Sequence, residues 1–256
     1  MLSALTLERL AGVRHGFFTR AGGVSEGEFA SLNCGYSSGD DPLRVETNRA
    51  RALDRLGLAA ASLCTVRQVH GWDVVVAREP QPKRPTVEAD ALVTDRAGIA
   101  LGVLSADCAP VLLADPDAGV VGAAHAGWRG ARAGVIEATV QAMVELGAAP
   151  ERIHAAIGPC IAQASYEVGP ELLCEFTTDD PACADLFEPV AGSDDRLRFD
   201  LKGYVLSRLA RADIAARAAL SDDTHADEAR FFSARRTRQR GGERFGLLLS
   251  AIALVE

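Results

Sequence analysis

The sequence predicts an α+β sandwich, and two observations lead to this fold class. Apolar, β-branched runs separated by turn residues gather in the middle of the chain, between residues 63 and 126. Helical patterns are inserted singly instead of alternating with every strand, which favours an α+β sandwich over a series of βαβ units. A chain of 256 residues with 48% hydrophobic side chains can bury a full core. We therefore expect one domain that covers residues 1–256.

Each expected element is marked by its hydrophobic pattern and by the residues that end it. The chain begins with an expected strand at 12–20, a long polar loop at 21–41 and a helix at 42–56 that Gly57 stops. The central strands are expected at 63–70, 72–77, 90–94, 99–106, 110–114 and 119–125. Later elements are expected as helices at 131–147, 169–176 and 200–220, and as strands at 152–158 and 245–255.

Charge and composition narrow the possible partners and the compartment. The formal net charge of −8 argues against nucleic acid or an anionic membrane as a partner, because both call for clustered basic residues. No apolar stretch reaches the roughly 18 residues of a membrane span. The first ten residues lack the basic leader and apolar core of a signal peptide. We expect a cytoplasmic protein whose six cysteines are free thiols, metal ligands or nucleophiles.

A β-hairpin in the middle of the chain is expected to bring a cysteine and a histidine together. Residues 115–118, Asp-Pro-Asp-Ala, form a turn sequence between two apolar runs. If this turn closes the hairpin, paired residues have numbers that sum to 233, and Cys108 faces His125. Their Cβ atoms would then be roughly 5 Å apart, and a bulge at Gly119 would slip the register by one residue. A thiolate and an imidazole at this separation can share a metal ion or form a nucleophile and its base.

A third ligand candidate is His70, which stands at an expected strand end and is followed by Gly-Trp. Two histidines and one cysteine would hold zinc with one tetrahedral position open, which is a catalytic arrangement. His15 is the rival ligand, whereas His154 and His225 lack a comparable sequence context. A metal-free cysteine hydrolase, in which a histidine activates the thiol, is the alternative that these residues leave open.

The stretch that follows His125, Gly-Trp-Arg-Gly, suggests an anion site beside these residues. The glycines 127 and 130 allow the backbone to turn sharply. The helix expected from about Ala131 has no Ser, Thr, Asp or Asn cap, so its first N–H groups would be free to bind an anion together with Arg129. The alternative is structural, with Arg129 paired to a surface acid and Trp128 packed in the core.

Motifs along nearly the whole chain, from about His15 to the last strand, resemble one family. They occur in the order HGFFTRAGG, RQVHG, EADALVT, SADCAPVLLAD, AAHAGWRG, IGPCI, YEVGPEL and FFSARR. This pattern is similar to the laccase-domain family, also described as multicopper polyphenol oxidoreductase-like or YfiH-like proteins. The resemblance implies one domain of α/β/β/α type, with mixed sheets packed face to face and helices outside. It also implies a catalytic zinc ion held by His70, Cys108 and His125.

The resemblance further implies a purine nucleoside enzyme as the function. The implied reactions are phosphorolysis of adenosine, inosine or methylthioadenosine and deamination of adenosine, so the partners would be a small nucleoside and phosphate. Editing of peptidoglycan precursors is the alternative, and a copper-dependent polyphenol oxidase is a second one. Five histidines are too few for a four-copper oxidase, which needs about ten, but one Cu²⁺ in the same three-ligand site is possible in vitro. The zinc deaminase signature H-x-E with P-C-x-x-C is absent, so any deamination would use a different scaffold.

The resemblance implies substrate contacts as well. Arg20 and Asn33 match positions that line the family's pocket, and Arg67 is a further candidate for phosphate beside Arg129. The chain departs from the family pattern near its end, where residues 223–225 read Asp-Thr-His instead of Cys-Thr-Tyr and Glu243 replaces a glycine before an arginine. Because of these departures, the resemblance does not imply which residues of the C-terminal third contact the substrate. The implied metal ligands are not affected.

Overall fold

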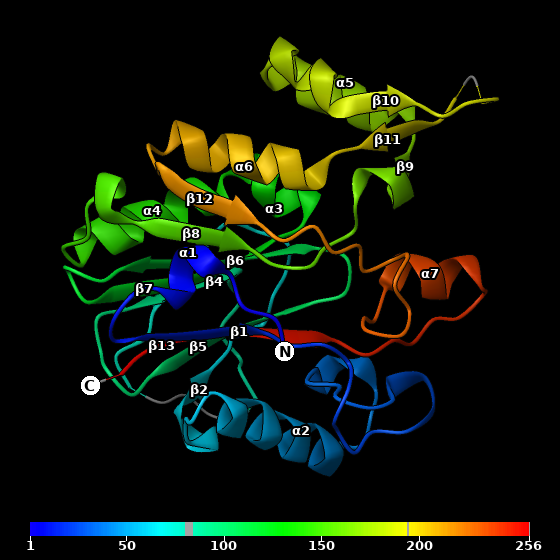
Figure 1. Cartoon of the computed structure of the whole chain (residues 1–256). Coiled ribbons are helices and arrows are strands. Elements are labelled where there is room, and N and C mark those ends of the chain that lie inside the picture. The colour runs from blue at the N-terminus through cyan, green and yellow to red at the C-terminus, as the bar shows by residue number, and fades with distance from the viewer. Residues whose placement is uncertain (80–83, 194, 256) are drawn as a thin grey trace.

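The computed structural model describes residues 1–79, 84–193 and 195–255, and it has two mixed β-sheets packed face to face (Figure 1). The larger sheet has the strand order β12 (Ala216–Ala219), β8 (His154–Ile157), β6 (Ala109–Asp115), β7 (Val120–Ala126), β4 (Ala91–Thr94) and β3 (Val74–Val76). The smaller sheet has the order β1 (Val13–Phe17), β13 (Leu248–Leu254), β5 (Ala100–Ser105) and β2 (Leu63–Cys64). Each sheet contains both parallel and antiparallel pairs.

Helices cover the outer faces of both sheets (Figure 1). The helices are α1 (Leu5–Glu8), α2 (Pro42–Arg55), α3 (Trp128–Ala133), α4 (Val135–Glu145), α5 (Pro170–Asp179), α6 (Leu201–Arg211) and α7 (Ala234–Gln239). Short 3₁₀ helices span Gly27–Phe29, Tyr36–Ser38, Ala60–Ser62, Pro150–Arg152, Gln163–Ser165 and Pro181–Leu186. A small third sheet beside α5 has the order β10 (Phe187–Pro189), β11 (Leu197–Phe199) and β9 (Glu167–Val168). No helix in the described ranges is long and apolar enough to cross a membrane.

Three of the four buried clusters among the described residues correspond to the three interfaces between the layers, which confirms the predicted sandwich. Along β6, Val111 packs with the helix-side cluster while its neighbour Leu112 packs with the cluster between the two sheets. Along β13, Ile252 faces the larger sheet and Ala251 faces the α2 side. This alternation follows from the two-residue period of a strand. Since both strands are buried on both faces, they read as continuous apolar runs.

Two expected helices have different bounds in the structure. The helix expected at 200–220 ends at Arg211, because Asp213 adopts a positive φ of 60° and Ala216–Ala219 then pairs as a parallel strand with β8. The helix expected at 131–147 begins earlier, at Trp128, and breaks at Gly134, whose φ is 104°. After this break, α4 buries Val135, Ile136, Thr139, Val140 and Met143.

The strand expected at 63–70 is only two residues long. After Cys64 the chain leaves the smaller sheet, and only an isolated bridge joins Arg67 to Glu88. The segment that contains His70 is consequently a loop that crosses from β2 of one sheet to β3 of the other.

The hairpin forms as expected, but its register is two residues away from the prediction. Pro110 pairs with His125 and Asp115 pairs with Val120, so paired numbers sum to 235 instead of 233. The turn is longer because Gly119 takes a positive φ of 62° and is added to it. The side chain of Asp115 accepts hydrogen bonds from the N–H groups of residues 117 and 118 inside this turn. A shift of two residues keeps every side chain on its face of the sheet, so Cys108 stays on the same face as His125.

Candidate functional site

Three segments bring two histidines and a cysteine to one point of the molecule. His70 lies in the crossing loop between β2 and β3, Cys108 lies between β5 and β6, and His125 lies near the end of β7. One ligand atom from each side chain lies within 4.8 Å of the other two. The Sγ atom of Cys108 is 3.8 Å from Nε2 of His70, and the two imidazole rings meet edge to face with centroids 5.0 Å apart. Among the described residues this is the one such His, Cys and carboxylate group that could hold a metal ion.

A buried carboxylate, Asp90, orients both histidines. Its oxygen lies 2.8 Å from Nδ1 of His125, which leaves Nε2 of that ring directed toward the other ligands. The same carboxylate accepts hydrogen bonds from the backbone N–H groups of residues 69, 70 and 71 at 2.7–3.0 Å. These bonds hold His70 at its positive φ of 62°. Metal-binding histidines are commonly held by a carboxylate in this way.

Sequence reasoning missed Asp90 as a functional residue. The signal available in the sequence was an acidic residue placed directly before the buried strand β4, where an unpaired charge would be costly. Its partners lie about 20 and 35 residues away along the chain, so no local pattern predicts them.

The two glycines of Gly-Trp-Arg-Gly allow helix α3 to approach the ligands closely. A Cβ atom on Gly127 would lie 2.9 Å from Cδ2 of His70 and 3.0 Å from Sγ of Cys108. A Cβ atom on Gly130 would lie 2.6 Å from the carbonyl oxygen of Gly71. Both positions therefore need glycine because of close packing against the His70 loop.

Electrostatics in this cluster favour a thiolate. Burial by itself would raise the pKa of Cys108, but His125 and His70 outweigh burial and lower it to about 6. Burial would lower the pKa of His125, but Cys108 and Asp90 raise it to about 9. A metal ion binds a thiolate and a neutral imidazole, so binding would release the proton from His125. The donor set of two imidazole nitrogens and one sulfur fits zinc with one coordination position open.

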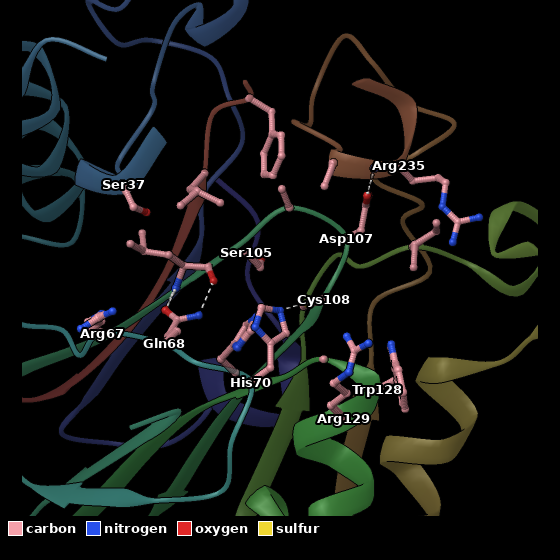
Figure 2. A pocket seen from close by; sticks show the side chains of 18 of the residues that line it. Ser37, Arg67, Gln68, His70, Ser105, Asp107, Cys108, Trp128, Arg129 and Arg235 are labelled. Atoms are coloured by element: carbon pink, nitrogen blue, oxygen red, sulfur yellow. Dashed lines mark hydrogen bonds between the residues drawn. The ribbon is translucent and has the colours of Figure 1, made fainter. Parts of the chain in front are cut away.

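The ligand cluster lies in a pocket of about 720 Å³ (Figure 2). Arg67 and Arg129, which the sequence analysis names as candidates for binding phosphate, both line this pocket. Figure 2 shows Arg67 and Gln68 on one side of His70, and Arg129 with Trp128 on the other. Arg67 forms an ion pair with Glu88 at 2.9 Å, whereas the guanidinium of Arg129 stacks over the Trp128 ring at 4.3 Å.

Two of the expected substrate contacts are not among the pocket-lining residues. Arg20 donates to the carbonyl oxygens of residues 30 and 228 and stacks over Phe232, so it joins two loops. Asn33 is fully buried; its amide donates to Ser38 and Asp40 and its oxygen accepts from the N–H groups of residues 35 and 247. Both side chains hold the long loop against neighbouring segments.

The other histidines are engaged elsewhere. The Nε2 atom of His15 accepts the Ala4 N–H at 2.9 Å, and burial lowers the pKa of this ring. His225 lies 2.7 Å from the Gln239 side chain, and His154 opens strand β8. The rival ligand, His15, is thus outside the cluster.

The expected anion site at a helix N-terminus differs in the structure. Helix α3 has only six residues and starts at Trp128, after the uncapped Gly127. The N–H of Ala131, expected to be free, donates to the carbonyl oxygen of Gly127 at 2.8 Å. The first N–H groups of this helix are therefore those of residues 128–130, three positions earlier than expected.

Residues 223–225 depart from the family pattern at Asp223 and His225, and the unchanged Thr224 between them contacts Asp107 beside the cluster. Thr224 is fully buried and donates to the Asp107 carboxylate at 2.7 Å. Ser233 and the N–H of Arg235 donate to the same carboxylate. Since Asp107 precedes Cys108 and has a φ of 89°, these bonds fix the backbone that presents the thiol. Sequence reasoning missed Asp107 and Arg235, which both line the pocket.

The remaining departure lies outside the pocket lining. Arg244, which follows Glu243, stacks over Phe29 at 4.9 Å and pairs with Glu28 at 3.3 Å. This arginine therefore braces the long loop.

Known proteins are similar to this chain in both sequence and fold. A Deinococcus radiodurans protein named purine nucleoside phosphorylase is 49% identical over 191 residues, which are 75% of this chain and 72% of that protein. A Pseudomonas aeruginosa protein of the same name is 38% identical over 231 residues, 90% of this chain and 91% of the relative. The crystal structure of a Neisseria meningitidis protein from the DUF152 family superposes with a TM-score of 0.86, at 34% identity over 96% of both chains. The family model for multi-copper polyphenol oxidoreductase laccase matches residues 14–254, and the chain belongs to this family.

Proposed function

We propose that this protein is a zinc-dependent purine nucleoside enzyme that cleaves adenosine, inosine or methylthioadenosine with phosphate. The observation that carries the proposal is the cluster of His70, Cys108 and His125 inside a pocket of about 720 Å³ that arginines also line. A pocket of this size accommodates a small molecule. The relatives named purine nucleoside phosphorylase support the same reaction class.

In phosphorolysis, an oxygen of phosphate forms a bond to C1′ of the ribose while the bond from C1′ to the purine nitrogen breaks. The electron pair of that bond leaves with the base, which takes up the proton that the phosphate carried, and the sugar 1-phosphate is the second product. Arg129 contributes by binding the phosphate and holding it against the sugar, because a guanidinium pairs with two oxygens at once. Binding in the right orientation removes much of the entropic barrier of a two-substrate reaction.

A metal in the cluster would be held by His70, Cys108 and His125, with Asp90 fixing the two imidazole rings. Zinc supplies Lewis acidity that activates a water molecule or polarises a substrate atom. With water as the second reactant, the same pocket would deaminate adenosine: the 6-amino group leaves as ammonia and an oxygen takes its place, which gives inosine.

A multi-copper oxidase has less support, although the family carries that description. The described residues contain one group of three possible ligands, and the chain has five histidines in all. One copper ion could occupy the same ligands, since Cu²⁺ binds nitrogen and sulfur donors more tightly than Zn²⁺.

The decisive test combines metal analysis with product analysis. Protein purified without added metal should contain about one zinc per chain, because the three ligands form one site. Adenosine should yield adenine and ribose 1-phosphate only when phosphate is present. Inosine formed without phosphate would report deamination. Cys108→Ala should lose the metal and both activities, whereas Cys174→Ala, which removes an exposed thiol outside the pocket, should keep them.

Two results would contradict the proposal. A fully active, zinc-free Cys108→Ala enzyme would exclude the metal role. Untouched nucleosides with a zinc-loaded enzyme would exclude the nucleoside reaction, and hydrolysis of peptidoglycan precursors by the same protein would favour the editing alternative.

A further inference from the structure

Arg129 and Arg235 line the pocket, as do Arg84 and Arg238, and no carboxylate side chain among the described residues forms an ion pair with any of these four arginines. Arg67, by contrast, is paired with Glu88. The chain as a whole has a formal net charge of −8, so these positive charges in the pocket do not reflect a generally basic protein. Unpaired guanidinium groups that line a pocket favour an anionic ligand.

Arg235 is held in place by contacts that leave its charge available. Its Nη1 atom donates to the backbone carbonyl oxygen of Glu167 at 2.6 Å, and its guanidinium carbon lies 5.2 Å from the centre of the Tyr166 ring. Its backbone N–H donates to Asp107 at 2.7 Å (Figure 2). That carboxylate also accepts from Thr224 and Ser233, so its oxygens are already occupied. The remaining guanidinium donors of Arg235 can therefore bind a ligand.

Arg129 lies on the helix side of the cluster, and its exposed guanidinium stacks on Trp128. The Trp128 ring packs against Phe176 with ring centroids 6.4 Å apart. Trp128 directly follows Gly127, where a Cβ atom would lie 3.0 Å from Sγ of Cys108. The stacked guanidinium is therefore presented on the same side of the pocket as the candidate metal ligands, with its donors available to a ligand.

Tyr166 lines the same pocket as both arginines and offers a hydroxyl donor. Its ring lies 5.2 Å from the guanidinium carbon of Arg235. Burial raises the pKa of this hydroxyl. The hydroxyl stays protonated at neutral pH, and no hydrogen bond to it is present among the described residues.

We propose that Arg129, Arg235 and Tyr166 form a subsite for a tetrahedral phosphate oxyanion beside the metal cluster. Two planar guanidinium groups and a hydroxyl provide several charge-assisted donors, which suits a ligand with three or four acceptor oxygens. The inference rests on the proposed phosphorolysis, because it identifies where the phosphate binds. It adds Arg235 and Tyr166 to the binding residues, and it assigns no phosphate contact to Arg20 or Arg67.

Direct binding of inorganic phosphate tests this subsite without any turnover. Trp128 and Trp72 are the two tryptophans of the chain, so a Trp72→Phe background assigns the fluorescence signal to the ring under Arg129. Phosphate is titrated into the metal-loaded protein at constant ionic strength. Arg235→Gln should weaken binding about 10- to 100-fold and Tyr166→Phe about 5-fold, as expected for lost charge-assisted and neutral hydrogen bonds. Arg240→Gln, directly after the same helix but outside the pocket and paired with exposed Glu228, should bind like the parent.

Steady-state kinetics separate this inference from the proposed function. Arg235→Gln should raise the KM for phosphate while the KM for adenosine and the zinc content stay unchanged. If the parent enzyme binds phosphate tightly but cleaves no nucleoside, the phosphorolysis proposal fails and the subsite stands. If phosphorolysis is normal and Arg235→Gln and Tyr166→Phe leave phosphate binding unchanged, the subsite is wrong and the function stands.

A nucleoside 5′-monophosphate distinguishes two sources of the same phosphate group. Competition between inorganic phosphate and the monophosphate, lost in Arg235→Gln, would show that the subsite takes a phosphate ester. Binding of inorganic phosphate alone would identify it as the site of the co-substrate. Arg235→Lys, which keeps the charge and loses the planar fork, should fall between the parent and Arg235→Gln in phosphate affinity.

Discussion

At the scale of single residues, the Asp90 carboxylate sets the geometry of two ligands at once. Replacing it in Asp90→Asn puts an NH2 group against the backbone N–H donors of the His70 loop and removes the charge that stabilises the Nδ1–H of His125. Metal affinity should fall about 10- to 100-fold, as for other lost partners of metal-binding histidines. Competition with a chromophoric chelator measures this affinity. Asp73→Asn, an exposed carboxylate close by in sequence, should leave it unchanged, and equal affinities for both variants would contradict the role of Asp90.

The sequence predicted the three candidate ligands more successfully than the residues that support them. Cys108 and His125 could be paired because a hairpin turn is a local signal, and an error of two residues leaves them on the same face. His70 is a candidate only through its expected strand end and the Gly-Trp that follows it, because its loop crosses between two sheets and no local pattern places it beside the hairpin. Asp90 could not be predicted, because its hydrogen bonds join segments that only the folded chain brings together.

At the scale of elements, close packing of helix α3 on the His70 loop is a second requirement of the site. Gly130→Ala would press a Cβ atom against a backbone oxygen at 2.6 Å, and backbone cannot swing aside as a side chain can. We expect this variant to shift α3 and to lower both metal affinity and stability, by about 1–3 kcal/mol for overpacking. Gly71→Ala is the matched control, because its Cβ would have only ordinary contacts at 3.6 Å. Urea unfolding and chelator competition measure both, and an equal loss in the two variants would rule out this packing explanation.

The far end of the hairpin is fixed by Asp115, a fully buried carboxylate. Burial would raise its pKa, but the N–H groups of residues 149 and 118 and the Arg152 guanidinium outweigh burial and lower it. A lowered pKa means that this carboxylate stabilises the fold above its unfolded pKa of about 4 and loses that contribution as the pH falls below it.

Asp115→Asn should therefore cost about 2 kcal/mol of unfolding free energy at pH 7. The difference from the parent should shrink as the pH falls from 4 toward 3. Urea unfolding across this range measures it, with the exposed Asp117→Asn as a control that shows little difference at any pH. A gap that stays constant with pH would mean that packing, not charge, is what Asp115 contributes.

The elements themselves were predictable where their signals are local. The helix at 42–55 has proline at its first position and an aspartate cap, and the structure reproduces it almost to the residue. The sequence predicts a helix where the structure has the strand Ala216–Ala219, because alanine and arginine favour helices. Parallel pairing with β8, a tertiary contact, overrides that preference.

At the scale of the whole molecule, the candidate metal ligands lie where the chain passes between the two sheets. His70 follows β2 of the smaller sheet and precedes β3 of the larger one, and Cys108 connects β5 to β6 in the same direction. His125 belongs to β7 in the centre of the larger sheet. A bound metal would therefore tie both crossings to the sheet, so its binding energy should stabilise the entire sandwich.

Metal binding should consequently raise the thermal unfolding midpoint of the protein. A ligand at 100 times its Kd adds about 2.7 kcal/mol when it binds only the folded state, which for a chain of this size raises Tm by about 5–10 °C. Calorimetry of the chelator-stripped protein with and without added zinc measures the shift, and renewed chelation should reverse it. Cys108→Ala should show little shift, while Cys174→Ala should behave like the parent because its thiol is exposed and outside the cluster. Equal stabilisation of both variants would mean that zinc binds elsewhere and that the two crossings are held by packing alone.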